Sequence, residues 1–389
     1  MTSGRTESFV ASEAQYHEAA QQATGLDDFG DEGYLEGLRV LLVAYDENPR
    51  LSRQGRRNVE GQIVRILRNR LRAEEAWKRY PSVLQHEIRR PIVITGMVRT
   101  GSTALHYLMG QDPGIQKLEY WLSAYPQPRP PRDEWEAHEH YRSAQKRIDA
   151  LYAADPSVEA IHFMQADWPE ECGHLLQQSF TDDCFEATAT IPSYVAWYSG
   201  NHHLETYRRH RRLIQLIGST DPKRRWLLKY PVHLRHFRAL LEVYPDACVV
   251  QTHRDPRDVL SSYCSFLARI RAIHEEEVDR EAITREQMEV WARACDDALV
   301  LRERLDPCQL YDLSMDEFLE DPVGSVEKIY DHFGQELSQR GRRAIEDWNE
   351  RNPQHRRGEH VHSKRETGVA EREIVERFGG YMDHFGMKR

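Results

Sequence analysis

Apolar side chains recur every three or four positions through much of the first 88 residues, with charged residues between them. This period is typical of amphipathic helices that bury one face. The clearest runs contain Tyr34, Leu35, Leu38, Leu41 and Leu42, and then Val59, Ile63, Ile66, Leu67 and Leu71. We therefore expect residues 1–88 to form an N-terminal helical extension packed on the core of the protein.

Short continuous apolar runs replace the helical pattern at residues 92–95, 226–229 and 248–252. Runs of this length indicate buried strands, and a helical pattern follows each of them. Strands that alternate with helices form a parallel sheet with helical crossovers. The pattern predicts an α/β domain over residues 89–389. Its P-loop-like parallel sheet is flanked by helices, with a candidate strand near 309–312 and a helical C-terminal part.

Proline positions set further helix boundaries. A proline-rich crossing at residues 126–132 precedes a helix that we expect over residues 133–153. Pro169 suits the first position of another helix, through the segment Pro-Glu-Glu-Cys-Gly-His-Leu-Leu. A further helix is expected over residues 233–243, and one more begins near Pro256.

Composition and charge restrict the classes of partner. The net charge of −10 argues against nucleic acid. No apolar run approaches the ~18 residues of a membrane span, and the N-terminus does not resemble a signal peptide. The six cysteines are scattered without a C-x-x-C pair, which is typical of reduced thiols. We expect a cytoplasmic protein, and the sequence predicts no oligomeric state.

The segment after the first apolar run carries the strongest motif. Gly96 and Gly101 enclose four residues and Ser102-Thr103 follow, which is the phosphate-loop spacing with its lysine replaced by Ser102. The backbone amides of residues 100–104 (Thr100, Gly101, Ser102, Thr103 and Ala104) can surround an anion at a helix N-terminus. Arg99 supplies a positive charge within the loop, which lacks the usual lysine. The alternative is a tight turn with a surface arginine.

Two more basic positions lie at predicted strand ends. Arg254 follows the third strand, and Ser262 lies about two helical turns further on, so both could face one phosphate. The alternative is a salt bridge and an exposed hydroxyl. Lys229 ends the second strand, where it could serve the site or lie at an edge with its charge in solvent. Because ligands bind at the carboxyl ends of parallel strands, these turns should meet at one site.

The candidate general bases are less well defined. Glu119 follows the helix of the phosphate loop, and His233 opens a later helix. Glu170 and Glu171 would lie in a first helical turn, where the helix dipole favours carboxylates without any catalytic role. The C-terminal segment 355–365 holds three histidines among arginines. A basic flap over a phosphate fits it better than a zinc site, because the arginines would repel a cation, and a solvated basic loop is the other alternative.

Together these motifs resemble the sulfotransferase family that uses 3′-phosphoadenylyl sulfate (PAPS). Val-Arg-Thr-Gly-Ser-Thr at 98–103 is similar to the family's 5′-phosphosulfate loop, and Arg254 with Ser262 to its 3′-phosphate site. Lys229-Tyr-Pro is similar to a family K-x-P element. The basic loop at Arg356, Arg357 and Gly358 resembles the family's C-terminal loop over the cofactor. The resemblance covers roughly residues 91–365 and implies sulfuryl transfer to a hydroxyl or amine without a metal.

The resemblance is closer to the bacterial and tyrosylprotein-type branch than to the cytosolic steroid and phenol enzymes. In the family, a proline usually precedes the basic residue of the phosphate-binding loop, and this chain has Val98 there. The segment Lys-Tyr-Pro-Val-His is two residues longer than the catalytic K-x-H element of the cytosolic enzymes. Related enzymes use as their base a glutamate that lies just after the helix of the phosphate loop. The order of candidate bases is therefore Glu119, His233 and Glu170, with Lys229 as the catalytic cation.

Two other functions remain open, a small-molecule kinase with a degenerate phosphate loop and a non-catalytic nucleotide-binding protein of the same fold. A kinase would need a loop lysine and an acidic metal ligand. The acceptor is not readable from the motifs. An aromatic or lipid-like small molecule is suggested by a group of aromatic residues that could line a pocket or the core: Tyr120, Trp121, Tyr125, Phe163, Trp168, Tyr194, Trp197 and Tyr198.

Overall fold

A five-stranded parallel sheet forms the centre of the computed structural model, which describes residues 8–154, 163–352 and 368–389. The strand order is β2-β3-β1-β4-β5. Central strand β1 pairs in register with both neighbours, Ile92 lying opposite Leu227 of β3 and Cys248 of β4. The strands are β1 (Ile92–Gly96), β2 (Ile115–Lys117), β3 (Arg225–Lys229), β4 (Cys248–His253) and β5 (Leu310–Ser314).

The sequence predicted the α/β class and four of these strands. Edge strand β2 escaped prediction because three residues are too short to show a period. Both faces of the sheet are buried, which explains the continuous apolar runs. Along β1, Ile92 and Ile94 enter the core on one face of the sheet, and Val93 enters the core on the other.

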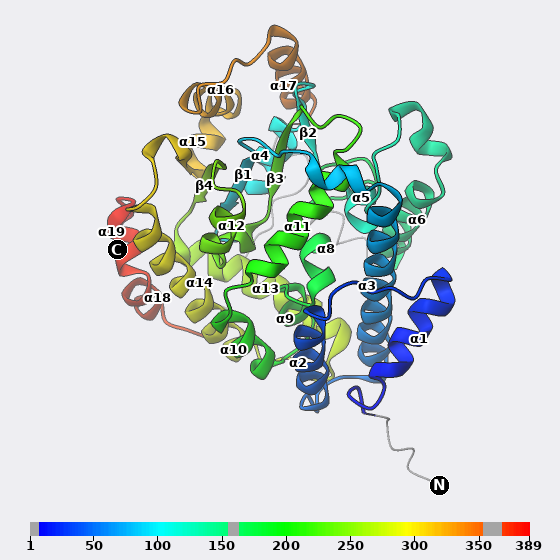
Figure 1. Ribbon diagram of the computed structural model, residues 1–389. Coiled ribbons are helices and arrows are strands. Elements are labelled where there is room, and N and C mark those ends of the chain that lie inside the picture. The colour runs from blue at the N-terminus through cyan, green and yellow to red at the C-terminus, as the bar shows by residue number, and fades with distance from the viewer. Residues whose placement is uncertain (1–7, 155–162, 353–367) are drawn as a thin grey trace.

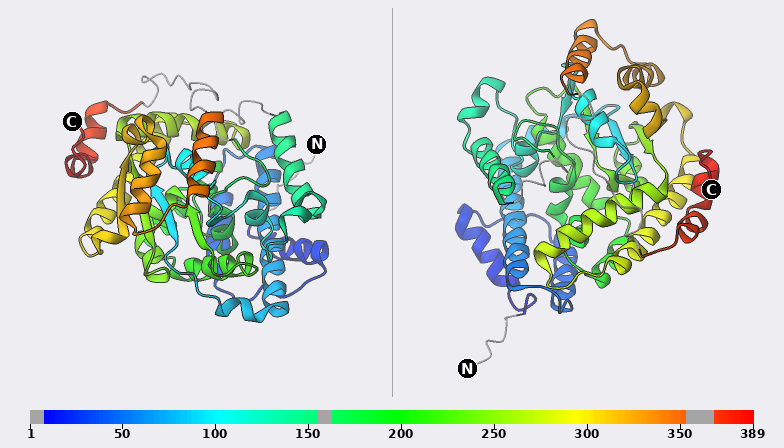
Figure 2. Two further views of the ribbon diagram at one scale, coloured as in Figure 1. Left: turned by 90° about the horizontal axis from the view of Figure 1, so that it is seen from above. Right: turned by 180° about the vertical axis from the view of Figure 1, so that it is seen from behind.

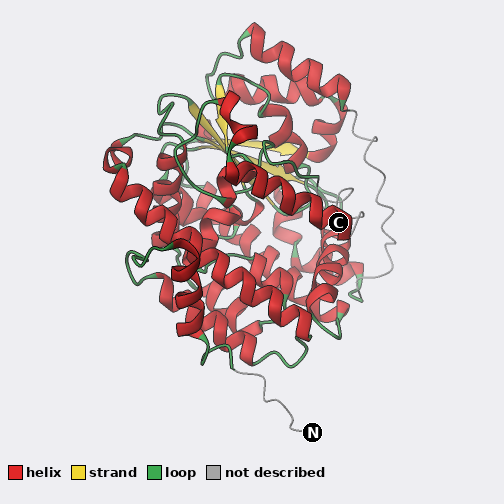
Figure 3. Ribbon diagram, turned by 90° about the vertical axis from the view of Figure 1, so that its right-hand side faces the viewer, coloured by secondary structure: helices red, strands yellow, loops and turns green. Residues whose placement is uncertain are grey.

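Helices surround the sheet on all sides in Figures 2 and 3. Those within the central part of the chain are α4 (Ser102–Met109), α5 (Tyr120–Ala124), α6 (Glu139–Ala154), α8 (Gly173–Leu176), α9 (Cys184–Thr188), α10 (Pro192–Gly200), α11 (Leu204–Ile217), α12 (Phe237–Val243) and α13 (Pro256–His274). The C-terminal helices are α14 (Arg280–Arg302), α15 (Met315–Glu320), α16 (Pro322–His332), α17 (Gln339–Arg351), α18 (Glu371–Arg377) and α19 (Gly379–His384). Short 3₁₀ turns are η1 (Pro81–Gln85), η2 (Arg132–Ala137), η3 (Gln177–Ser179), η4 (Pro231–Leu234) and η5 (Pro307–Gln309).

The N-terminal helices α1 (Glu13–Thr24), α2 (Tyr34–Asp46) and α3 (Arg53–Arg79) lie at the end of the molecule away from α16 and α17 (Figure 1). Their apolar faces join the same core as the central helices, for example through Leu38, Leu67 and Trp121. The amide of Asn69 also donates to the carbonyl of Ala124 at 2.6 Å. The division into residues 1–88 and 89–389 stays a prediction, because packing alone does not test independent folding.

Three predicted helices differ from the structure. Residues 133–153 divide into η2 and α6, and residues 233–243 divide into η4 and α12. The helix predicted from Pro169 is wrong, since α8 begins only at Gly173. Pro169 instead forms an antiparallel bridge with Glu119, and the amide of Glu170 donates to the carbonyl of Leu118 at 2.7 Å. These long-range backbone bonds hold the segment extended where its local sequence favours a helix.

Candidate active site

The loop between β1 and α4 has the backbone that an anion cradle needs. Gly96 has φ 138°, and a Cβ there would overlap the carbonyl oxygen of Thr252 on β4. Gly101, at the N-terminus of α4, has φ 87°. Arg99 adopts φ 62°, which is uncommon for a residue with a side chain and typical of functional loops. The loop hydroxyl of Thr100 donates to the carbonyl of Met97 at 2.7 Å and bonds Thr252 Oγ1 at 2.6 Å.

The two predicted anion-binding groups contact each other. Arg99 Nε donates to the hydroxyl of Ser262 on α13 at 3.1 Å. Arg254 follows β4, and its Nη1 donates to the backbone carbonyl of Arg99 at 3.2 Å. The sequence separated these residues by more than 150 positions, and the parallel sheet brings them together as predicted.

The positive charge here is only partly compensated. Burial, and then the neighbouring Arg254, lower the pKa of Arg99. Arg254 lies 3.8 Å from Asp258 one helical turn away, but within the described ranges Arg99 forms no ion pair with a carboxylate. A half-buried guanidinium next to a second one is stabilised by a bound anion.

Lys229 lies at the end of β3 and is almost fully buried. Its Nζ donates to Thr103 Oγ1 on α4 at 2.8 Å and forms an ion pair with Glu171. Lys229 therefore connects the N-terminus of the cradle helix to a carboxylate. The backbone explains this position of Glu171, since the amide of Cys172 donates to the carbonyl of Lys229 at 3.1 Å.

A cavity of about 470 Å³ joins these groups. One part of its wall is polar and comes from the loop, the strand ends and the segment before α8. The other part is largely apolar and comes from α9, α13 and α15. Its lining residues are Val98, Arg99, Gly101, Ser102, Thr103, Ala104, Glu171, Asp183, Cys184, Ala187, Lys229, Tyr230, Pro231, Val232, Arg254, Tyr263, Phe266, Leu267 and Met315.

The three candidate bases lie away from this lining. Glu119 is buried in an ion pair with Arg129 at 3.0 Å, and burial raises its pKa. His233 is buried with its Nδ1 bonded to the hydroxyl of Tyr207 at 2.8 Å, and burial lowers its pKa well below 6.5. Glu170 is also buried, and its Oε1 accepts the amide of Glu171 at 2.8 Å. None of the three is among the described residues that line the cavity.

The predicted C-terminal loop and the predicted aromatic pocket do not form part of the described cavity. Arg356, Arg357 and Gly358, and the histidine-rich segment around them, lie outside the described residues. None of the eight aromatic residues suggested for an acceptor pocket lines the described cavity. The aromatic side chains that do line it, Tyr230, Tyr263 and Phe266, were not singled out.

Of the two cavity residues that the sequence analysis missed, only Glu171 could have been found from the sequence. Glu171 stood beside the chosen Glu170, and alternation along an extended segment would have put the two side chains on opposite faces. The helix expected at Pro169 hid this. Asp183 carried no motif, and only the fold places it against the cavity.

Comparison with known proteins defines the class. Residues 91–339 match the model of the sulfotransferase family, so the chain belongs to that family and the predicted resemblance is confirmed. The structure also resembles the crystal structure of sulfotransferase STF1 from Mycobacterium tuberculosis H37Rv, with a TM-score of 0.88 and 38% identity. That match covers 96% of this chain and 100% of the other.

Two further relatives agree with this class. Sulfotransferase STF9 from Mycobacterium avium gives a TM-score of 0.89 at 25% identity, over 97% of both chains. The omega-hydroxy-beta-dihydromenaquinone-9 sulfotransferase Stf3 of Mycobacterium bovis is 24% identical over 268 residues. This match covers 63% of this chain and 62% of Stf3, which is less than two thirds of that relative. In the described part of the chain, no helix has the length and apolar character to cross a bilayer.

Proposed function

We propose that this sulfotransferase moves a sulfuryl group from PAPS to a hydroxyl of a lipid-like small molecule. The observation that carries the proposal is the single cavity that joins the phosphate loop, Lys229 and Glu171 to a largely apolar wall. A polar end suits a sulfated nucleotide, and an apolar end suits a hydrophobic acceptor.

The residues present fit such a donor. Loop amides at the N-terminus of α4 and the half-buried Arg99, which forms no ion pair among the described residues, suit the 5′-phosphosulfate. Arg254 and Ser262 suit the 3′-phosphate, because a guanidinium and a hydroxyl can both donate to one phosphate. The position that holds lysine in ATP-binding loops is Ser102, which makes a triphosphate a poorer fit.

The same geometry supports roles for two residues in the transfer. The bond between sulfur and the bridging phosphate oxygen breaks as a bond from sulfur to the acceptor oxygen forms. Lys229 can stabilise the negative charge that grows on the bridging oxygen. Glu171 faces the cavity beside Lys229 and can take the acceptor proton. We therefore propose Glu171 as the base in preference to Glu119, His233 and Glu170.

The acceptor is proposed from the apolar wall and from one relative. The apolar wall presents mainly hydrocarbon and thioether surface to an acceptor, from Ala187, Phe266, Leu267 and Met315. The name of Stf3 states that its acceptor is an omega-hydroxylated dihydromenaquinone, which is a lipid carrying a hydroxyl. A hydrophobic alcohol is the acceptor class that both observations support.

Calorimetric titration with adenosine 3′,5′-bisphosphate and with ATP tests the donor. The bisphosphate should bind far more tightly, and Arg254→Ala should weaken it by about 2–3 kcal/mol through loss of charge-assisted contacts. Ser262→Ala should cost about 1 kcal/mol. Turnover of PAPS with hydrophobic alcohols should survive EDTA. Equal or tighter ATP binding, or activity restored only by Mg²⁺, would favour the kinase alternative.

A further inference from the structure

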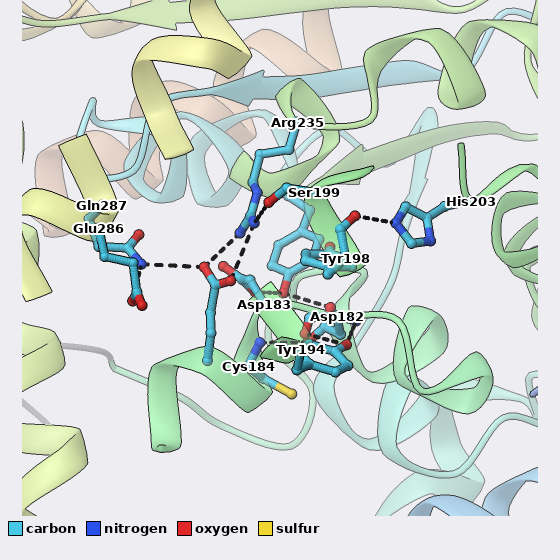
Figure 4. A network of polar contacts seen from close by, with 12 residues as sticks. Asp182, Asp183, Cys184, Tyr194, Tyr198, Ser199, His203, Arg235, Glu286 and Gln287 are labelled. Atoms are coloured by element: carbon cyan, nitrogen blue, oxygen red, sulfur yellow. Dashed lines mark hydrogen bonds and ion pairs between the residues drawn. The ribbon is translucent and has the colours of Figure 1, made fainter. Parts of the chain in front are cut away.

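A pair of carboxyl groups shares one tyrosine hydroxyl beside the apolar wall of the cavity. Tyr230 Oη lies 2.8 Å from Asp182 Oδ2 and 2.5 Å from Asp183 Oδ1. Asp183 is 8% exposed and lines the cavity, whereas Asp182 is fully buried behind it. Figure 4 shows both aspartates close to Tyr194, Tyr198 and Arg235.

Counting hydrogens assigns the protonation of this pair. A phenol has one hydrogen and can donate it to only one of the two carboxyl groups. The other short contact then needs a hydrogen from the carboxyl itself. Asp182 already accepts from the amide of Cys184 at 3.1 Å and from Gln177 at 3.3 Å, so it is the better site for the negative charge. Asp183 is then the neutral acid, and its Oδ1–H donates to Tyr230.

The surrounding charges agree with this assignment. Burial raises the pKa of Asp182 to about 6, and burial together with Asp182 and Glu186 raises that of Asp183 well above its usual value. Arg235, which opposes this rise, is already paired with Glu186 at 2.7 Å. Among the described residues, neither Asp182 nor Asp183 forms an ion pair.

The second oxygen of Asp183 is left for a ligand. Within the described part of the chain, Asp183 Oδ2 forms no hydrogen bond, although the side chain is more than nine-tenths buried and lines the cavity. Because the acid hydrogen is on Oδ1, Oδ2 is a carbonyl-type oxygen that accepts a hydrogen bond. Its neighbours in the lining include Cys184, Ala187 and Tyr263, so it is a polar group within a mainly apolar wall.

Lys229 and the tyrosine that bonds Asp183 point in opposite directions at the end of β3. Tyr230 has extended backbone angles, φ −166° and ψ 125°, directly after Lys229 at the end of β3. Successive side chains of an extended segment point to opposite sides. Lys229 points to Glu171 and Thr103, and Tyr230 points to the aspartate pair. Asp183 therefore contacts the tyrosine, whereas Glu171 contacts the lysine on the other side of this segment.

We propose that Asp183 determines acceptor specificity by accepting, through Oδ2, a hydrogen bond from a second hydroxyl of the acceptor that is not sulfated. The acceptor class is thereby narrowed from a hydrophobic alcohol to a hydrophobic diol. This inference rests on the proposed function only in naming the first hydroxyl as the one that reacts.

Calorimetry with decanediols that carry the second hydroxyl at successive carbons tests the proposal, with 1-decanol as reference. Titrations are made with and without adenosine 3′,5′-bisphosphate. One diol should bind about fivefold more tightly than 1-decanol, the gain expected of one hydrogen bond. Its monomethyl ether, which keeps the oxygen but has no hydrogen to donate there, should bind like 1-decanol.

Two variants separate recognition from folding. Asp183→Asn can donate its amide to Tyr230 and keep a carbonyl oxygen toward the cavity, so the preference for the diol should persist. Asp183→Leu removes that oxygen and should abolish the preference. The proposal is overturned if no diol binds more tightly than 1-decanol, if the ether equals the diol, or if Asp183→Asn loses the preference. If the bisphosphate fails to bind while the diol preference remains, the proposed function fails and the assignment of Asp183 stands.

Discussion

At the scale of single residues, the surroundings of Lys229 suggest why a lysine is held at this strand end. It is almost fully buried, and its charge is balanced by one carboxylate, Glu171, and one hydroxyl, Thr103. A buried ammonium needs such partners because the loss of hydration is costly. A group that accumulates negative charge during a reaction would offer Lys229 a second anionic partner beside Glu171.

Replacing Lys229 by alanine should lower kcat by about 10²-fold or more and change donor affinity only a few-fold. The charge on the bridging oxygen grows only as its bond to sulfur breaks, so the lysine acts mainly in the transition state. Steady-state kinetics and bisphosphate titration measure the two effects separately. Lys223→Ala, which removes a charge from an exposed position, is the matched control. Unchanged kcat in Lys229→Ala would refute the role.

Glu171→Gln should lower kcat by about 10²- to 10⁴-fold, because the amide cannot take the acceptor proton. The variant keeps the size of the side chain and an oxygen for Lys229, so the bisphosphate should still bind. Thermal stability should fall, because the neutral amide no longer balances the buried ammonium of Lys229. Glu119→Gln and His233→Ala, away from the cavity lining, are the comparison. If Glu119→Gln or His233→Ala abolishes transfer while Glu171→Gln turns over normally, the base is the residue that was replaced in the inactive variant.

The positions of the three basic residues proposed for the site were predictable because these residues end or follow buried strands, and strand ends of a parallel sheet converge. Arg99, Arg254 and Lys229 all line the cavity for this reason. Glu171 and Asp183 do not follow strands. The position of Glu171 depends on a backbone bond between distant segments, from Cys172 to Lys229, and that of Asp183 on a contact with the side chain of Tyr230. Contacts of this kind leave no periodic trace in the sequence.

At the scale of elements, β1 and its loop are specified by a few backbone requirements. The strand is short and β-branched, and Gly96 ends it where only glycine fits beside β4. By contrast, β2 is too short to show a pattern, and the segment at Pro169 follows long-range bonds against its local preference. Local pattern therefore predicts the elements that bury apolar runs, and it fails where distant backbone partners compete.

Gly96→Ala should lower the free energy of unfolding by about 1–3 kcal/mol or more, because the left-handed backbone and the overlap with Thr252 both resist a side chain. Thermal or urea unfolding measures the change. Gly61→Ala, in an exposed position of α3 with open space around it, should instead stabilise by about 0.5–1 kcal/mol. Equal effects of the two substitutions would contradict the strain assigned to Gly96.

At the scale of the whole molecule, the N-terminal helices and the sheet are packed into one continuous interior. Leu67 of α3 is fully buried in the same core as Trp121 and Leu228. Arg209 of α11 adds a buried ion pair to Glu74 of α3 at 2.6 Å. We expect contacts of this kind to couple the stability of the N-terminal helices to that of the site.

Leu67→Ala should lower the free energy of unfolding by about 2–5 kcal/mol, the usual range for a leucine removed from a core. The loss should appear in a single calorimetric transition that adenosine 3′,5′-bisphosphate shifts to higher temperature. Leu151→Ala, 39% exposed on α6, should change stability by less than about 0.5 kcal/mol. Two separate transitions, with only one sensitive to the bisphosphate, would show that residues 1–88 unfold independently.

The side chains of Lys229 and Tyr230 point in opposite directions, which limits the insertions and deletions that the end of β3 can tolerate. If one residue were inserted or deleted between Leu227, which pairs with β1, and the end of β3, the side chains that follow would point to the opposite side. The lysine would then turn toward the aspartate pair, and the tyrosine toward the hydroxyl of Thr103. Under the proposed roles, the length of β3 has to satisfy two ligand-binding requirements at once. New acceptors would be most easily accommodated by substitutions at Ala187 of α9 and at Phe266 and Leu267 of α13, which line the cavity away from the strand ends.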